Sequence, residues 1–392
     1  MKYGIMTYHN IPNFGAILQA YSLCKVINEL GYECDVIDYE CQNIVKRELE
    51  YHGSGNAIKL ALHRVFSWPH VEKKILQCQE FAKQYYSREK YTLKTIPKAN
   101  KMYDGFISGS DTVSYTHLDV YKRQEYIPCQ LKKYIKNGFA LETIRAIANA
   151  YYKLKYRMDG RIARCSILLF ANKETRNYLI PNKERKNYPI MTELGSLERK
   201  NTIAGKKNMF TILSGGRLIY RKGFDLLYDA IERVPERYEF RVVFVGNGPL
   251  YEHLKERVDA SAILKKRVTM LGRIPHEKME QVYQNADIFF MPSLRETTGS
   301  VVLEALENGL PVATMNKYGA SIILNDDCGI LYEVENNTEP AETIAKVIME
   351  CVDNPGKVQA MEPFCKKRAE ELSFANKVQI YEGLYQKLVA KS

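Results

Sequence analysis

The chain has 392 residues, of which 45% are hydrophobic and 26% charged, and its formal net charge is +11. This composition is typical of a globular protein with two or three domains and argues against a disordered or fibrous chain. Nine scattered cysteines without paired Cys-x-x-Cys spacing argue against a disulfide framework or a zinc site. Because residues 1–10 do not read as a signal peptide and no apolar run reaches membrane-spanning length, we expect a cytoplasmic protein.

The first forty residues predict a β-strand, an α-helix and a second strand. Residues 1–8 are mostly apolar, and the following helix carries apolar side chains at helical spacing and ends at Gly31. The second strand is predicted from Glu33 to Tyr39. This βαβ unit opens a parallel sheet, and its first loop lies where such sheets bind ligands.

Several segments of residues 1–111 resemble the polysaccharide pyruvyl transferase family. They are Gly4–His9 with Asn13–Tyr21, Val36–Tyr39 and Tyr103–Asp111. The resemblance implies transfer of an enolpyruvyl-derived group from phosphoenolpyruvate to a sugar. It ends after Asp111, where the family normally continues Gln-Val-Trp, and the basic and histidine residues of that family's second domain have no counterpart in this chain.

Residues 112–124 match neither neighbouring region. They show no apolar period, no turn signal and no cap. The peptide from Val113 to Gln124 resembles a translated sequencing-adapter fragment that recurs in reading frames from assembled metagenomes. We interpret it as an artefactual junction between two gene fragments, with a natural linker as the rival interpretation. His117 and Asp119 are therefore not treated as catalytic.

Residues 125–200 are strongly basic, with 16 Lys and Arg against 7 acidic residues. Basic and apolar side chains alternate from Lys132 to Arg164 as they do on a basic amphipathic helix. Such a surface suits peripheral contact with an anionic membrane at the inner membrane face, and a solvated helix face is the alternative. No nucleic-acid-binding motif accompanies the charge, so no nucleic-acid partner is expected.

Strand and helix alternate regularly from residue 209 onward. The pattern predicts a doubly wound parallel sheet, which binds ligands outside the carboxyl ends of its strands. The predicted strands are Phe210–Ser214, Arg241–Val245, Val268–Leu271, Ile288–Met291, Pro311–Thr314 and Gly329–Tyr332, and the predicted helices include Asp225–Val234, Leu250–Val258, Lys278–Asn285 and Ser300–Asn308.

The loop after the first of these strands combines a flexible backbone with cations. Gly215 and Gly216 precede Arg217, and Lys222 follows five residues later. Arg217 can hold a phosphate as a planar fork, and Lys222 can act on it as a point charge. Ordinary surface cations are the alternative interpretation.

The next two strands also end in loops that suit a nucleotide. Gly246 and Gly248 form a tight strand-to-helix turn, and a Gly-x-Gly alone is weak evidence for phosphate binding. Arg273 and Ile274 follow the third strand and precede a helix.

Two carboxylates bracket the loop and first helical turns after the fourth strand. Between Glu296 and Glu304, the segment Thr298-Gly299-Ser300 leaves backbone N–H groups at the helix start, where the helix dipole favours an anion such as a diphosphate. Glu304 lies about one turn further along and can accept two hydrogen bonds from a vicinal diol such as a ribose. Both carboxylates could instead complement the helix dipole and face solvent.

The Glu-x7-Glu spacing and the Gly-Arg-Leu…Lys-Gly pattern resemble the retaining, GT-B-fold glycosyl transferases group 1 family. Thr298 stands where that family usually has an aromatic residue. The resemblance implies catalytic roles for Glu296, Arg217 and Lys222, of which the two cations neutralise the leaving diphosphate. It implies that the nucleotide base lies near Arg273 and Ile274. The full set of expected donor-binding residues is Gly215, Gly216, Gly246, Gly248, Arg273, Ile274, Thr298, Gly299, Ser300 and Glu304.

The same resemblance predicts the fold class and the domains. We expect an α/β, GT-B-like protein with two Rossmann-like doubly wound parallel-sheet domains, the N-terminal one chimeric or incomplete. Ser373 is the predicted N-cap of the last helix. The expected parts are the pyruvyl transferase-like fragment (1–111), the junction (112–124), the end of an acceptor domain (125–200), the donor-binding domain (201–370) and a terminal crossover helix (371–392).

The family resemblances together imply a retaining, hexosyl-type glycosyltransferase of surface polysaccharide synthesis. Its partners are a nucleotide sugar and a saccharide or lipid-linked acceptor. No cofactor or metal site is expected, and the donor loops contain no Asp-x-Asp pair. The alternatives are phosphoenolpyruvate-dependent pyruvyl transfer, and a non-catalytic chimeric product that only binds nucleotide sugar.

Overall fold

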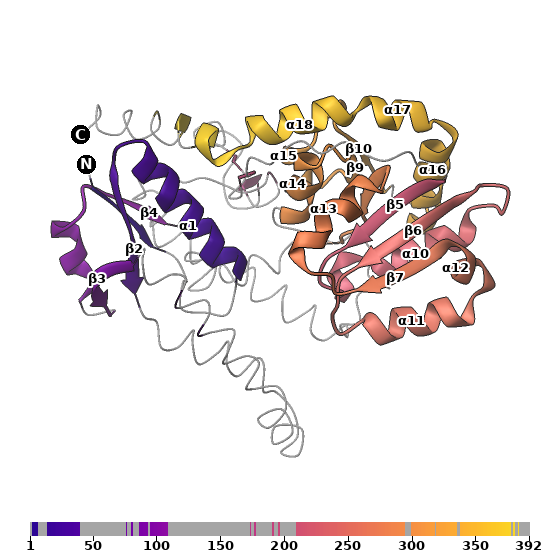
Figure 1. Ribbon diagram of the computed structural model, residues 1–392, viewed down its shortest axis with the longest axis horizontal. Helices are drawn as coiled ribbons and strands as arrows, with labels where there is room; N and C mark the ends of the chain where they lie inside the picture. The colour runs from indigo at the N-terminus through magenta and orange to yellow at the C-terminus, as the bar shows by residue number, and fades with distance from the viewer. Residues whose placement is uncertain are drawn as a thin grey trace, which may run out of the picture. The chain divides into compact units, whose positions relative to one another are not determined.

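The computed structural model forms two compact units, Met1–Lys122 with Val378–Ser392, and Arg123–Lys377 (Figure 1). Each unit contains its own parallel sheet. The residues that the structure describes are 2–6, 14–39, 86–92, 95–108, 209–294, 299–317, 319–334 and 338–377, with the shorter pieces 76, 80, 173, 176–177, 190–191, 195–196, 379–380 and 383.

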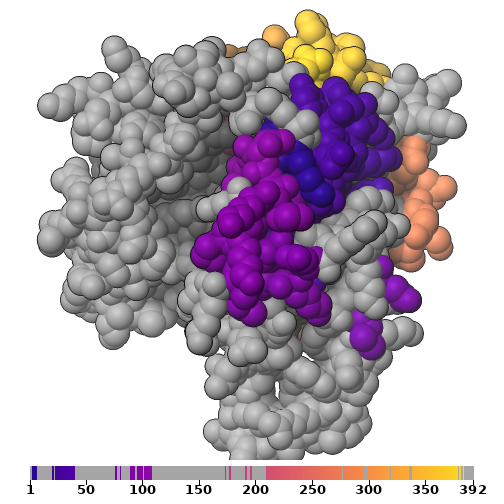
Figure 2. Space-filling model, turned by 90° about the vertical axis from the view of Figure 1, so that its left-hand side faces the viewer, coloured from indigo at the N-terminus to yellow at the C-terminus, as the bar shows by residue number. Residues whose placement is uncertain are grey.

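The N-terminal unit contains a four-stranded sheet in the order β3-β2-β1-β4, with parallel pairing throughout. The predicted βαβ opening is confirmed, and Figure 2 shows it in indigo beside the purple segments of the same unit. A buried cluster that includes Ile5, Ile27 and Val36 joins the sheet to its helix. The elements are β1 (Lys2–Met6), α1 (Phe14–Glu29), β2 (Glu33–Tyr39), β3 (Tyr86–Tyr91), the 3₁₀ helix η2 (Ile96–Lys101) and β4 (Gly105–Ser108).

The second unit contains a six-stranded parallel sheet in the order β10-β9-β8-β5-β6-β7. Every strand predicted from residue 209 onward is confirmed, with ends within one residue of the prediction. The four predicted helices are confirmed within two residues. The strands are β5 (Phe210–Gly215), β6 (Phe240–Val245), β7 (Val268–Gly272), β8 (Ile288–Met291), β9 (Val312–Met315) and β10 (Gly329–Tyr332).

Helices cover both faces of this sheet, as a doubly wound fold requires. Alternate residues of one strand point to opposite faces, so Ile212 and Leu213 of β5 belong to different buried clusters. One cluster packs α10 (Phe224–Arg233), α11 (Tyr251–Ala260), α12 (Ala262–Arg267), α16 (Pro340–Asp353) and α17 (Pro355–Ala360) against the sheet. The other packs α13 (His276–Gln284), α14 (Ser300–Glu307), α15 (Ala320–Ile323) and α18 (Glu362–Glu371).

Ser373 caps a helical segment, as the sequence predicted. Its Oγ accepts a hydrogen bond from the backbone N–H of Asn376 at 3.3 Å, and residues 374–377 and 379–380 are helical.

In the described part of the chain, no helix is long and apolar enough to cross a membrane. The adapter-like segment and the basic stretch from Lys132 to Arg164 lie outside the described residues. The five domain boundaries therefore stay predictions.

Candidate functional site

The loops after β5, β6 and β7 are joined to one another by backbone hydrogen bonds. The N–H of Gly216 donates to the carbonyl of Val245 at 2.9 Å, and that of Gly246 donates to Gly272 at 2.7 Å. The N–H of Leu218 donates to Asn247 at 3.1 Å. The three loops therefore form one connected surface at the carboxyl ends of the strands, where the sequence predicted the site.

Glycines make the close approach between these loops possible. A Cβ at Gly246 would collide with the carbonyl oxygen of Gly216, and one at Gly248 would collide with that of Leu218. A Cβ at Gly215 would collide with the carbonyl of Val245. The Gly-x-Gly turn thus has a packing role, as expected of a tight structural turn between strand and helix.

Replacing Gly246 with alanine is expected to destabilise the fold more than replacing Gly216. Both residues have a left-handed backbone, with φ of 131° and 123°, so both variants carry strain of about 1–3 kcal/mol. Only the Gly246 variant adds a collision, because no atom of the described residues lies within 4 Å of a Cβ at Gly216. Urea unfolding of the two variants checks this order. Equal losses of unfolding free energy would show that the packing contact is unimportant.

The cationic loop after β5 contacts the segment that leads out of β8. The N–H of Leu294 donates to the carbonyl of Arg221 at 2.9 Å, and the absence of a side chain at Gly223 lets the carbonyl of Pro292 approach it. Lys222 ends the 3₁₀ helix η6 (Tyr220–Lys222) and is half-buried, whereas Arg217 is exposed. The structure therefore places Lys222 and Gly223 beside the start of the predicted carboxylate loop.

Part of that carboxylate loop lies outside the described residues. The structure does not describe residues 295–298, so the roles predicted for Glu296 and Thr298 stay predictions. Gly299 is buried, has a φ of 74° and forms the N-cap of α14. No side-chain hydrogen bond caps α14 within the described residues, so the backbone N–H groups at its start suit an anionic ligand.

Glu304 lies in the middle of α14 and is half-buried. Its Oε2 accepts a hydrogen bond of 3.1 Å from the hydroxyl of Tyr283 in α13. The sequence interpretation identified Glu304 but not Tyr283. The ring of Tyr283 is buried in the core, and only the fold shows which side chain its hydroxyl meets.

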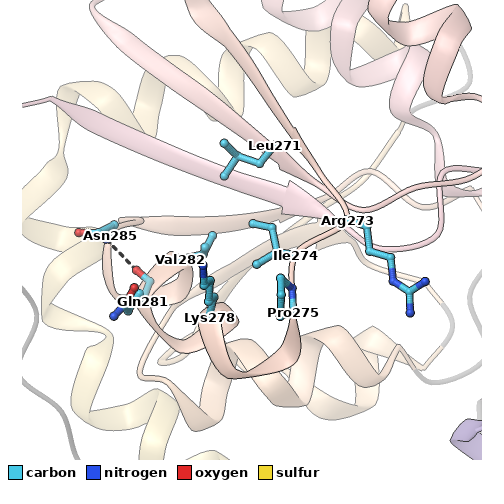
Figure 3. Close-up of a pocket in the computed structure, with 8 residues that line it drawn as sticks. All are labelled: Leu271, Arg273, Ile274, Pro275, Lys278, Gln281, Val282 and Asn285. Atoms are coloured by element: carbon cyan, nitrogen blue, oxygen red, sulfur yellow. Dashed lines mark hydrogen bonds between the residues drawn. The ribbon is translucent and has the colours of Figure 1, made fainter.

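Arg273 and Ile274 border a hollow with a volume of about 390 Å³ (Figure 3). Figure 3 shows the guanidinium of Arg273 extended away from the other labelled side chains. The hollow thus joins the loop after β7 to α13 and does not include Arg217, Lys222 or Glu304. Its lining comprises Leu271, Arg273, Ile274, Pro275, Lys278, Gln281, Val282 and Asn285.

The site is rich in cations, with Arg217, Arg221, Lys222 and Arg273 in two of its loops. Arrays of this kind bind phosphate oxygens through charge-assisted hydrogen bonds. Over the described ranges, no group of three or more His, Cys, Asp and Glu side chains could hold a metal ion.

The second unit matches a known protein family. The model of the family Glycosyl transferases group 1 matches residues 196–368, which supports a domain of this kind in that part of the chain. The gpi3 subunit of phosphatidylinositol N-acetylglucosaminyltransferase from Schizosaccharomyces pombe is 29% identical over 180 residues, which are 45% of this chain and 39% of that protein. A phosphatidylinositol N-acetylglucosaminyltransferase subunit from Arabidopsis thaliana is 36% identical over 127 residues, or 32% of this chain and 28% of that protein. The chain thus spans well under half the length of these curated relatives.

Solved structures of other proteins share the fold of this chain. Sucrose-phosphate synthase from Thermosynechococcus elongatus has a TM-score of 0.61 at 14% identity, with all of both chains covered. The Anabaena protein Alr3699/HepE, solved with UDP, has a TM-score of 0.59 at 14% identity and covers 98% of this chain and 100% of its own. At this identity the likeness concerns the fold alone, and it confirms the predicted α/β, GT-B-like class.

Proposed function

We propose that the chain transfers a sugar, with retention of configuration, from a nucleoside diphosphate sugar to a saccharide or lipid-linked acceptor. This proposal is supported by three features of the segments that follow β5 and β8 at the carboxyl ends of these strands. These are the half-buried Glu304, the start of α14 at Gly299 and Ser300, and the Lys222 loop bonded to the segment after β8.

Each group has a distinct part in the proposed reaction. Glu304 holds the ribose hydroxyls, and Lys222, Arg217 and the N–H groups at Gly299 and Ser300 hold the diphosphate. Departure of the diphosphate develops negative charge, which fixed cations and helix N–H groups stabilise. In a front-face displacement assisted in this way, the acceptor attacks from the side of the leaving group, so no protein nucleophile is needed.

The sugar ring is proposed to lie against Glu296, which follows the β8 segment directly in sequence. The base is proposed to lie near Arg273 and Ile274. Gly215, Gly216, Gly246, Gly248 and Thr298 complete the proposed donor site through backbone approach and hydrogen bonding.

Relatives indicate which ligands to test first. The Anabaena protein is described in complex with UDP, and the two curated relatives are named phosphatidylinositol N-acetylglucosaminyltransferases. A uridine diphosphate sugar and a lipid-linked acceptor are therefore the first pair. A role in surface polysaccharide synthesis, at the cytoplasmic face of the inner membrane, belongs to the same proposal.

Calorimetry with UDP, ADP and GDP tests donor binding, and transfer of radiolabelled sugar to lipid and saccharide acceptors tests activity. We expect micromolar to millimolar binding of one diphosphate, the usual range for enzyme substrates. NMR of the product reports the anomeric configuration. If no nucleoside diphosphate binds, the proposed function is wrong, and an inverted product rejects retention alone.

Two alternatives give different results in the same assays. Pyruvyl transfer rests on the motifs of residues 1–111, and it predicts consumption of phosphoenolpyruvate instead of nucleotide sugar. A non-catalytic chimera predicts diphosphate binding without transfer. Amplification of genomic DNA across codons 100–135 tests the junction, and a continuous amplicon contradicts the artefact interpretation.

A further inference from the structure

A hydrogen bond between two side chains links α13 to α14 beside the proposed donor site. Tyr283 is 2% exposed, and its ring lies against Phe289 of β8 with 6.3 Å between ring centroids. Its hydroxyl donates to Oε2 of Glu304 at 3.1 Å. The tyrosine that donates this hydrogen bond is thus packed in the core, whereas the glutamate that accepts it is half-buried and lies at the proposed site.

The geometry leaves Glu304 able to bind a ligand. A phenolic hydroxyl donates one hydrogen, whereas a carboxylate offers about four acceptor positions on two oxygens. The bond from Tyr283 uses one position on Oε2 and leaves those on Oε1 for other donors. Because the tyrosine ring is packed among core side chains, it cannot follow movements of the glutamate without opening the core.

Orientation of this carboxylate before binding has an energetic consequence. Ordering a flexible glutamate side chain costs conformational free energy. A side chain that is already held in its binding orientation avoids most of that cost when the ligand arrives. The Tyr283 bond therefore favours binding of a group that presents two adjacent hydroxyls.

We propose that Tyr283 is a positioning residue, which holds the Glu304 carboxylate in the orientation that accepts the 2′- and 3′-hydroxyls of the donor ribose. This inference rests on the proposed function. It adds a residue that does not touch the ligand and whose effect is confined to the ribose.

A merely structural bond between the two helices makes a different prediction. Loss of such a bond lowers stability and weakens every ligand alike. Loss of a positioning bond weakens only those ligands that carry the ribose diol. The comparison of a diphosphate with its 2′,3′-dideoxy form separates the two cases.

The test uses the full chain and the nucleoside diphosphate, among UDP, ADP and GDP, that binds most tightly. Dissociation constants for it and for its 2′,3′-dideoxy form are measured by calorimetry with Tyr283→Phe, Glu304→Ala and the double variant. Tyr228→Phe is the matched control, since Tyr228 is also fully buried and its hydroxyl has no hydrogen-bond partner among the described residues.

We expect Tyr283→Phe to weaken the ribose ligand about tenfold, which corresponds to about 1.4 kcal/mol. The dideoxy ligand should change less than about twofold, and the substitution should have no further effect once Glu304 is alanine. Tyr228→Phe should bind both ligands like the parent chain.

Equal weakening of both ligands, additive effects in the double variant or unchanged affinity in Tyr283→Phe would each overturn the inference while leaving the proposed function intact. If the parent chain binds none of the three diphosphates, the proposed function fails and the inference fails with it.

Discussion

Lys222→Ala is expected to reduce sugar transfer by about 100-fold or more, because one preorganised group that stabilises developing charge typically contributes 10²–10³ in rate. Lys222 ends η6 and is half-buried, so its charge is screened less by solvent than that of an exposed lysine. The neighbouring hydrogen bond from Leu294 to Arg221 fixes the loop against the segment after β8. Transfer of radiolabelled sugar at saturating acceptor measures the effect.

Two further variants show whether a loss of activity comes from the missing charge at residue 222 or from a general effect of the substitution on the fold. Lys266→Ala removes an exposed lysine from α12, which ends just before β7 begins and so lies at the opposite end of that strand from the site. It should transfer sugar at the parental rate. Lys222→Arg keeps the positive charge and should recover part of the activity. Activity of Lys222→Ala above about one third of the parental value contradicts a role in stabilising the leaving diphosphate.

The central strands β8 and β9 of the second unit could be predicted because they are buried on both faces. Such strands are short, nearly continuous apolar runs, and all four residues of β8 and of β9 are buried. The alternation of these runs with helical patterns then determines a parallel sheet. Because parallel strands have their carboxyl ends at one edge of the sheet, the loops of Gly215, Gly246 and Arg273 were predicted to lie at the ligand-binding edge.

Contacts between elements that are distant in sequence could not be predicted in this way. The Tyr283–Glu304 bond joins residues 21 apart on two helices. The sequence pattern that predicts each helix does not depend on this bond. The approach of Pro292 to Gly223 likewise depends on how two loops pack. For Glu296 the sequence says more than the structure does. Its motif is explicit in the sequence, whereas its position lies outside the described residues.

The burial of Arg267 could not be predicted from its residue type. A basic residue near a helix end ordinarily suggests a solvated cation, yet Arg267 is only 4% exposed. Its guanidinium lies 4.7 Å from the ring centroid of Phe240. It donates hydrogen bonds of 2.7–3.2 Å to four backbone carbonyls, those of Ile231, Val234, Pro235 and Tyr238. Burial lowers the pKa of Arg267, and these four oxygens replace the water that the cation has lost.

The substitution Arg267→Met is expected to destabilise the second unit by about 2–4 kcal/mol, because each buried carbonyl left without a donor costs about 1–3 kcal/mol. Two of the four carbonyls keep a backbone donor, since Ile231 also accepts from Val234 and Pro235 from Tyr238. The carbonyls that lose their hydrogen-bond donor are therefore those of Val234, the C-cap of α10, and of Tyr238, four residues later. Methionine preserves most of the apolar stem, so the substitution isolates the guanidinium.

Thermal unfolding of the full chain measures this effect, with an expected decrease in Tm of about 4–16 °C at 2–4 °C per kcal/mol. Arg233→Met is the matched control, because Arg233 is an exposed arginine in the last turn of α10 and should change stability by less than about 0.5 kcal/mol. Arg267→Lys retains a charge but replaces the fork of five donors with three on one nitrogen, so its Tm should fall between those of the parent and Arg267→Met. A Tm for Arg267→Met equal to that of the control would mean that solvent replaces the guanidinium without cost, and that the end of α10 does not depend on Arg267.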